Sequence, residues 1–236
     1  MSPSARKASS KAATPRIDLI YNALSRAILA QDLLPGTKLS EETIGSYFDA
    51  SRTIVRAALN RLHTESLVEF KQNRGAFVAS PSIEESRQVF EARNCIEREV
   101  ISRLAESITD QQLAALADHI EKERDASGDE DNPAAILLSG EFHLLAARMA
   151  GNDVFVGFLK SLISRTSLIL AQHGRHEESD CSVDEHLSIV EALRQRDTGA
   201  AAEAIVEHLQ HVLARSNLLD TRRPVRGLQE VLAQYS

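Results

Sequence analysis

A short cationic stretch of the sequence, ASRTIVRAALNRL at residues 50–62, contains side chains suited to contact a nucleic acid. If this stretch is a helix at 100° per residue, one quadrant of its surface, roughly, carries Arg52, Thr53, Arg56 and Asn60. The opposite side is apolar and carries Val55, Ala58, Leu59 and Leu62. Guanidinium groups match guanine edges or phosphates, and Thr and Asn reach bases or backbone. The pattern indicates either a DNA-contacting face or a solvated cationic face.

Three of the eight histidines stand out by their positions on the predicted helices and could together bind a metal ion. His143 shares a helix face with Ser139, while His186 and His208 each interrupt an apolar helical stripe. A neutral imidazole is a good ligand for zinc or nickel, and helices of a bundle can bring such groups together. The alternative is that each is a hydrogen-bonded histidine of the core or its boundary.

The elements around the cationic stretch predict a small DNA-binding domain. Apolar spacing predicts a helix over residues 16–31, which LLPG ends, and Ser40 caps a second helix to about residue 48. A third helix is expected over residues 51–64. LVEF and GAFVAS, separated by KQNR, then predict a β-hairpin. Three helices and a hairpin in this order make residues 16–80 a winged helix-turn-helix.

The remainder of the chain is expected to be mainly helical. Helical periodicity predicts helices near residues 82–107, 109–127, 133–150, 152–173, 183–196 and 198–219. Turn-forming stretches separate them, so residues 82–219 form an all-α bundle without a sheet. The tail over residues 220–236 contains one amphipathic stretch, LQEVLAQYS, expected to pack on the bundle or on a partner. Residues 1–15 are small and polar and are expected to form a disordered arm.

Charge and cysteine content narrow the class of protein. The net charge is -7, but residues 1–80 carry 11 Lys/Arg and 7 Asp/Glu, so an anionic partner is expected for this part alone. Only Cys95 and Cys181 are present, which indicates free thiols and a reducing cytoplasm. No apolar run is expected to span a bilayer, and the N-terminus has no secretory signal.

The first domain resembles the DNA-binding domain of the GntR family of bacterial transcription regulators. The resemblance rests on PGTKLSEETIGSYFDASRTIVRAALNRLHTESLVEFKQNRGAFVAS, and it departs from the family at Ala57 and at TES before the hairpin. Neither departure lies on the arginine face. The resemblance implies that the DNA contacts are Ser51, Arg52, Thr53, Arg56, Arg74 and Gly75.

The second domain resembles the FadR-type ligand-binding domain, called FCD, through FEARNCIEREVISRLA, GEFHLLAARMAGN, VDEHLSIVEALRQRD and EHLQHVL. Many such domains bind a divalent metal through an Asp and three His. His143, His186 and His208 match the three histidines, whereas Ser139 occupies the Asp position. The resemblance therefore implies a zinc or nickel site that lacks its carboxylate ligand, and it places Ser139 beside the effector.

Arg93 and Glu97 stand one helical turn apart and match an Arg-x-x-x-Glu motif of the same family. By spacing alone they are a surface ion pair. The resemblance implies instead that Arg93 faces the effector cavity and binds a carboxylate with its guanidinium fork. Arg165 is a second candidate for that cavity.

These features predict a homodimeric transcription repressor that binds an inverted-repeat DNA operator and responds to a small organic acid or sugar acid. A direct metal sensor, in which the ion is itself the signal, is the main alternative. A metal-dependent enzyme is less well supported, because the sequence shows no matched acid–base pair and no nucleophile motif.

Overall fold

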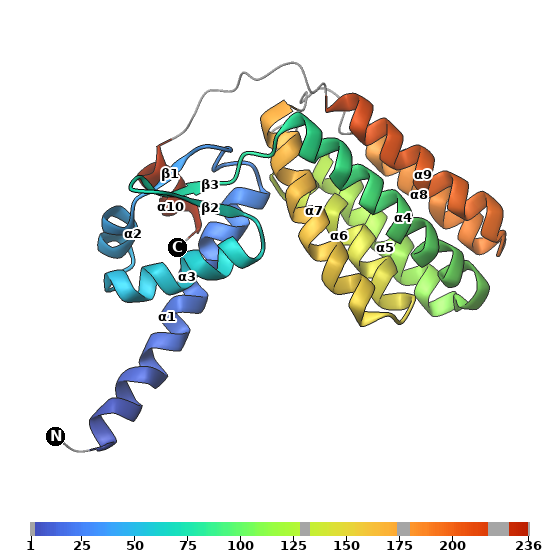
Figure 1. Cartoon of the computed structure of the whole chain (residues 1–236). Helices are drawn as coiled ribbons and strands as arrows, with labels where there is room; N and C mark the ends of the chain where they lie inside the picture. Colours follow the sequence, from blue (N-terminus) through green and yellow to red (C-terminus); the bar gives the residue numbers. More distant parts are fainter. Residues whose placement is uncertain (1–2, 128–132, 174–179, 217–226, 236) are drawn as a thin grey trace. The chain divides into compact units, whose positions relative to one another are not determined.

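The structure is a computed structural model that describes residues 3–127, 133–173, 180–216 and 227–235 (Figure 1). The chain forms two compact units. The first comprises Met1–Ser80 together with Arg223–Ser236, and the second comprises Pro81–Arg222. The first contains a small sheet and the second is built of helices, which confirms the predicted fold class.

The first unit is a winged helix-turn-helix. The helices of this motif are α1 (Pro3–Leu29), α2 (Glu41–Tyr47) and α3 (Arg52–Thr64). As predicted, the Ser40 hydroxyl caps α2 by accepting from the backbone N–H of Thr43 at 3.2 Å. Leu24, Ile44 and Leu59 are completely buried where the three helices meet.

The sheet of this unit has one strand more than the predicted hairpin. Strands β2 (Val68–Lys71) and β3 (Gly75–Val78) form the hairpin, and β1 (Lys38–Leu39) pairs with the other edge of β3. All neighbouring strands are antiparallel. A strand of two residues is too short to produce an alternating pattern, so β1 could not be predicted from the sequence.

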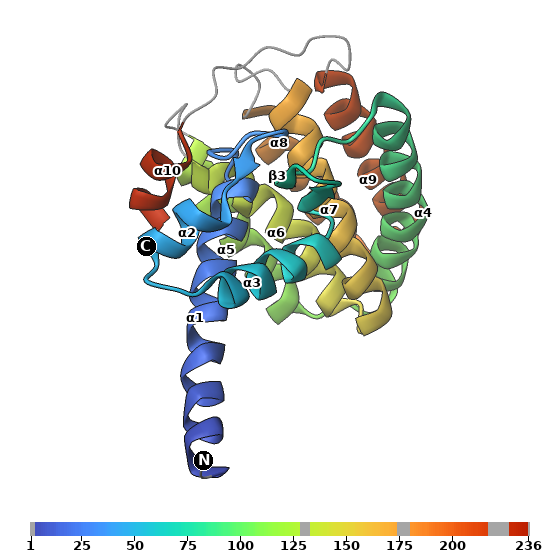
Figure 2. The same cartoon turned by 60° about the vertical axis from the view of Figure 1, so that its left-hand side comes forward.

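The disordered arm predicted for residues 1–15 is not what the structure shows. Helix α1 begins at Pro3 and continues through Pro15. More than half of residues 3–14 are Ala, Lys or Arg, which are strong helix formers. Figures 1 and 2 show this first part of α1 projecting beyond the other elements of its unit.

The second unit is a bundle of six helices within the described residues. They are α4 (Ile83–Ser107), α5 (Asp110–Ser127), α6 (Pro133–Met149), α7 (Asp153–His173), α8 (Asp180–Arg194) and α9 (Thr198–Arg215). Helix α4 packs against α9 and α7, and α5 packs against α6 and α8. Phe90, Phe142 and Leu209 are buried in the shared core. Cys95 is a free, exposed thiol on α4, whereas the side chain of Cys181 lies outside the described residues.

Helix α7 is an exception to the expectation that no run is apolar enough to span a membrane. Its mean hydropathy is 1.6 over a window of which 39% is buried. Contacts with α4 and α6 make α7 a helix of the bundle. Two large apolar side chains of this helix, Val154 and Phe158, are exposed.

The C-terminal tail was expected to pack on the bundle or on a partner, but its described part packs within the first unit. Residues 217–226 are outside the description, and α10 (Leu228–Tyr235) belongs to the first unit. Its main neighbour is α1, with further contacts to α2.

Candidate metal and DNA-binding sites

The two predicted faces of α3 are present in the structure. Val55, Ala58, Leu59 and Leu62 are all fully buried. Arg52, Thr53, Arg56 and Asn60 are all exposed. The packed face fixes the position of the helix, while the exposed face holds the arginines in solvent, where a DNA groove can meet them.

The first turn of α3 adds an anion-binding feature to this face. Ser51 is the N-cap residue and is exposed, yet its hydroxyl makes no capping hydrogen bond. The backbone N–H groups of the first turn have no intrahelical acceptor, and the helix dipole is positive there. A DNA phosphate is a suitable ligand for this end of the helix.

The arginines of α3 have different partners. Arg56 donates from Nε to Glu41 on α2 at 3.0 Å, and this pair is largely exposed. Arg61 donates to Asp18 at 2.8 Å, and its guanidinium lies 3.7 Å from the centre of the Tyr21 ring on α1. Arg61 therefore ties α3 to α1, whereas an exposed pair such as Arg56–Glu41 exchanges readily for a phosphate or a base.

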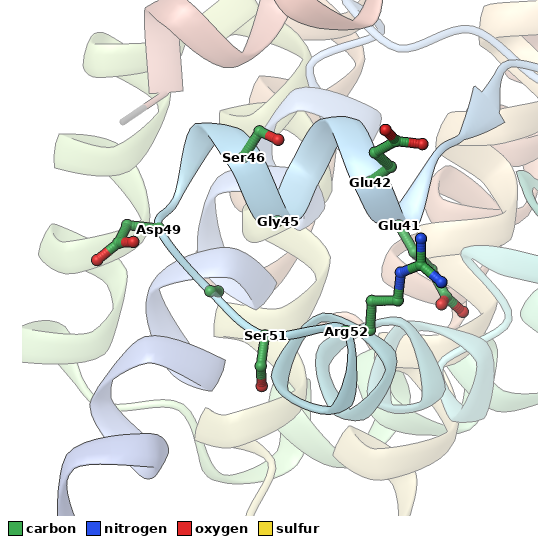
Figure 3. Close-up of a pocket in the computed structure, with 8 residues that line it drawn as sticks. Glu41, Glu42, Gly45, Ser46, Asp49, Ser51 and Arg52 are labelled. Carbon is green, nitrogen blue, oxygen red and sulfur yellow. The ribbon is translucent and has the colours of Figure 1, made fainter.

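A shallow hollow of about 460 Å³ lies between α2 and the start of α3 (Figure 3). Three carboxylates line it, those of Glu41, Glu42 and Asp49. Figure 3 shows the Arg52 side chain extending from α3 toward Glu41. The acidic lining makes this hollow unsuitable for an anionic effector.

The tip of the wing is the turn between β2 and β3. Arg74 is exposed, and its guanidinium lies 5.7 Å from the centre of the Phe77 ring. Gly75 has a φ of +95°, a conformation that side chains with a Cβ rarely adopt. The tight turn that Gly75 allows presents Arg74 to solvent.

The three predicted histidines converge inside the bundle. His143 on α6, His186 on α8 and His208 on α9 are buried, and one potential ligand atom from each lies within 4.8 Å of the others. Nε2 of His143 and Nε2 of His208 are 3.3 Å apart. The structure therefore brings together side chains that are 65 residues apart in sequence.

Each of the three imidazoles has a carboxylate behind it. Nδ1 of His143 lies 2.6 Å from Glu97, Nδ1 of His186 lies 2.8 Å from Glu123, and Nδ1 of His208 lies 2.7 Å from Glu185. A neutral imidazole that donates from Nδ1 has its lone pair on Nε2. All three Nε2 atoms are then available as metal ligands, with the carboxylates orienting the rings as in known metal sites.

The geometry of the Nε2 atoms fits a divalent cation. Nε2 of His186 is buried and has no hydrogen-bond partner among the described residues. The Nε2 atoms of His143 and His208 face each other, and neither carries a hydrogen when Nδ1 is the donor. Their 3.3 Å separation matches the ~3.3 Å expected between two ligands of a tetrahedral zinc ion. A cation among these atoms would satisfy all three lone pairs.

Burial favours the neutral form of two of these histidines, His143 and His208. Burial lowers the pKa of His143 to about 4 and that of His208 well below its ordinary value, although their glutamate partners oppose this. Burial by itself raises the pKa of Glu97, but Arg93 and His143 outweigh it, so this pKa is lowered. Ionised glutamates and neutral histidines are the protonation states that metal binding requires.

Arg93 connects to the triad through Glu97. It is buried, and it donates from Nε to Glu97 at 2.6 Å and from Nη1 to the Thr166 hydroxyl at 3.2 Å. Its Nη2 has no hydrogen-bond partner among the described residues. The pair is thus a buried one, not the surface pair that its spacing alone indicates, and it retains an unused donor.

Ser139 connects to the triad through Ser182 and Glu123. Its hydroxyl is 3.0 Å from that of Ser182, which donates to Glu123 at 3.2 Å. Since Ser182 uses its hydrogen on Glu123, Ser139 is the donor of the pair. Ser139 therefore supports the carboxylate that orients His186.

Arg165, on α7, donates from Nη1 to Glu85 near the start of α4 at 3.2 Å. Glu123 and Glu185 were not predicted as site residues. A signal for Glu123 exists, since it continues the buried stripe of Leu116 and Ile120 on α5, where an ionised group requires a partner. No comparable signal identifies Glu185.

A winged helix-turn-helix joined to a helical domain with a buried histidine triad defines a class of DNA-binding regulators. In agreement, residues 17–78 match the family of bacterial regulatory proteins called gntR, and residues 88–211 match the FCD domain. The chain belongs to the GntR family of DNA-binding transcriptional regulators and carries an FCD domain.

Curated relatives are regulators and not enzymes. The HTH-type transcriptional repressor RspR of Escherichia coli is 30% identical over 82% of this chain and 85% of its own. The HTH-type transcriptional repressor NanR of Salmonella newport is 28% identical over 84% of each.

Solved structures share the fold. Escherichia coli McbR/YncC superposes with a TM-score of 0.75 at 20% identity, covering 85% of this chain and 96% of that one. A GntR-type regulator from Rhodococcus sp. RHA1 gives the same TM-score at 23% identity, covering 89% and 100%.

Proposed function

We propose that the protein is a cytoplasmic repressor whose affinity for its operator changes when a small organic acid or sugar acid binds a divalent metal in the helical domain. The observation that carries the proposal is the convergence of three buried Nε2 atoms, each backed by a glutamate. The repressor assignment is supported by RspR and NanR, both named as repressors.

The DNA contacts that we propose are on α3, at its first turn and on the wing. Arg52, Thr53 and Arg56 would enter the major groove, and Ser51 with the first-turn N–H groups would bind a phosphate. Arg74, presented by the turn at Gly75, would contact the neighbouring groove or backbone.

His143, His186 and His208 would hold zinc or nickel. A bound ion supplies positive charge and an open coordination position for an oxygen ligand. Because Ser139 stands where related domains carry Asp, that position is left to water or to an effector carboxylate. Ser139→Asp should therefore raise the affinity for the metal.

The effector is expected to be an anion. Neutral imidazoles, a divalent ion, three glutamates, and the cations of Arg93 and Arg215 together leave a net positive charge. The unused Nη2 of Arg93 would bind the second oxygen of a carboxylate or a neighbouring hydroxyl. Arg165 remains a secondary candidate, because its pairing with Glu85 supports no direct role.

We also propose a homodimer formed through the helical domain, which would place two copies of α3 on an inverted repeat. Val154 and Phe158 lie one turn apart on α7 and are 66% and 59% exposed. Phe158→Glu should produce monomers in sedimentation, whereas Ala114→Glu, at an exposed position of α5, should not. A parent protein that is monomeric at micromolar concentration with and without DNA would contradict the dimer.

A direct metal sensor is the second candidate, since the triad is complete without an effector. One titration of operator affinity distinguishes the metal sensor from the acid-responsive repressor. The operator is first selected from random DNA, and binding is measured with zinc alone and with zinc plus each of a panel of organic and sugar acids. A change that requires both zinc and an acid supports the proposal, and a change with zinc alone supports the sensor. An acid response that persists in His186→Ala would contradict a metal-bound effector.

A further inference from the structure

The chain returns to its DNA-binding unit after completing the helical domain. Helix α10 lies beside α1 and α2 in both views (Figures 1 and 2) and belongs to the same compact unit. Val231 and Leu232 on α10 are completely buried. Helix α10 is thus part of the core of the first unit.

Polar contacts also hold α10 in this position. The Tyr235 hydroxyl donates to the carboxylate of Asp32, and the guanidinium of Arg26 lies 5.8 Å from the centre of the Tyr235 ring. Arg26 is in the last turn of α1, and Asp32 follows that helix. Both ends of the contact are therefore fixed by the packing of α1.

The chain leaves the helical domain at a residue that is also held firmly. Arg215, the last residue of α9, donates to both oxygens of Glu185, at 2.7 Å and 2.9 Å. The same carboxylate accepts from Nδ1 of His208. Glu185 therefore links the end of α9 to the histidine triad.

Two covalent connections join the units. The first runs over residues 79–82, between β3 and α4, and the second over residues 216–227, between α9 and α10. A fully extended chain of the second length reaches at most about 40 Å. The shorter first connection already keeps the units close, and a docked α10 adds a second limit, on the distance between the end of α9 and the start of α10, which restricts how the units can turn about the first connection.

We infer that α10 is a second anchor that restricts the positions of the DNA-binding unit relative to the helical domain. The inference rests on the proposed function in one respect: in a homodimer, the restriction would limit the half-site spacings that the two copies of α3 can reach. Otherwise it depends only on the docking of α10 and on the connectivity of the chain. The competing role, in which α10 only stabilises the fold of its unit, predicts no change in the movement between units.

The test compares two substitutions on α10. Val231→Asp places a charge in the buried contact and should release the helix, whereas Ala233→Asp adds the same charge at an exposed position. Spin labels on Asn22→Cys and Ala115→Cys, both exposed, report the distance between units after Cys95 and Cys181 are changed to Ser. Mixing with excess unlabelled chain ensures that each measured pair lies within one chain.

A second variant leaves α10 intact. A protease recognition sequence inserted after Thr221 allows the second connection to be cut in the folded protein. The distance distribution should broaden in Val231→Asp and after cutting, and it should stay as in the parent in Ala233→Asp. Unchanged distributions in both Val231→Asp and the cut protein would overturn the inference.

Operator binding gives a separate readout. On a set of operators whose half-site spacing varies, the cut protein should lose less affinity per added base pair than the uncut protein. Equal losses despite broadened distances would refute the link to half-site spacing but not the anchor. Equal losses together with unchanged distances would refute both.

Discussion

The arginine face of α3 and the histidine triad of the bundle are built on opposite principles. The arginine face comes from one helix, is exposed, and has exchangeable partners such as Glu41. The triad takes its histidines and glutamates from five helices, and every imidazole is buried. Substitutions on the first should affect binding and leave folding intact, whereas substitutions around the second should affect both.

The largest difference between the regions should appear on removing Glu97. Glu97→Ala leaves the Arg93 guanidinium and Nδ1 of His143 buried without their partner, which should cost about 3–5 kcal/mol in the free energy of unfolding. Glu99→Ala, which removes a half-exposed pair with Arg103 on the same helix, should cost at most about 1 kcal/mol. Urea denaturation of the metal-free protein measures both. Equal losses in the free energy of unfolding for the two variants would contradict the expected difference between buried and exposed pairs.

Acidification should destabilise the helical domain through its buried histidines. The pKa of His143 is about 4 in the folded protein and about 6.5 in an unfolded chain, so only the unfolded state binds this proton in between. Stability present at neutral pH should fall as the pH drops from about 6.5 to about 4, by about 3 kcal/mol. The lowered pKa values of Glu97, Glu123 and Glu185 add a further loss below about pH 4.5. Urea denaturation with chelator at successive pH values tests this, and a flat profile above pH 4.5 would contradict it.

On the exposed face, loss of an arginine should cost operator affinity alone. Arg52→Ala and Arg56→Ala should each weaken binding by about 1–3 kcal/mol while leaving thermal unfolding unchanged. Arg61→Ala is the control on the same helix. Its side chain contacts α1 and not the exposed face, so this variant should keep the operator affinity of the parent. Gel-shift titration measures the affinities. Parent-like binding by both Arg52→Ala and Arg56→Ala would exclude α3 as the DNA-contacting helix.

The smallest effect concerns the carboxylates behind the triad. Glu123→Gln keeps the shape of the side chain but weakens its hold on His186, and should reduce zinc affinity by about 10–100-fold. Glu121→Gln on the same helix alters only an exposed pair with Arg124 and should leave the affinity unchanged. Competition with a chelating dye measures both. Equal affinities would make Glu123 a purely structural residue.

The same contrast explains what the sequence predicts. The face of α3 follows from a 3.6-residue period, so Arg52 and Arg56 could be separated from the packed Val55 without a structure. The bundle was predicted by the same periodicity. A pattern within one helix says nothing about which helices become neighbours, so the pairing of Glu185 with His208 and Arg215 appeared only in three dimensions. The docking of α10 on α1 was missed for the same reason.

The metal content of the protein tests the central claim, that His143, His186 and His208 form a metal site without an Asp ligand. Protein purified without chelator or histidine tag is exposed to excess zinc or nickel, desalted and subjected to elemental analysis, with His186→Ala and the exposed-histidine control His63→Ala treated alike. The account predicts one ion per chain in the parent and in His63→Ala, and its loss from His186→Ala. A parent metal content near zero, or one unchanged in His186→Ala, would contradict it.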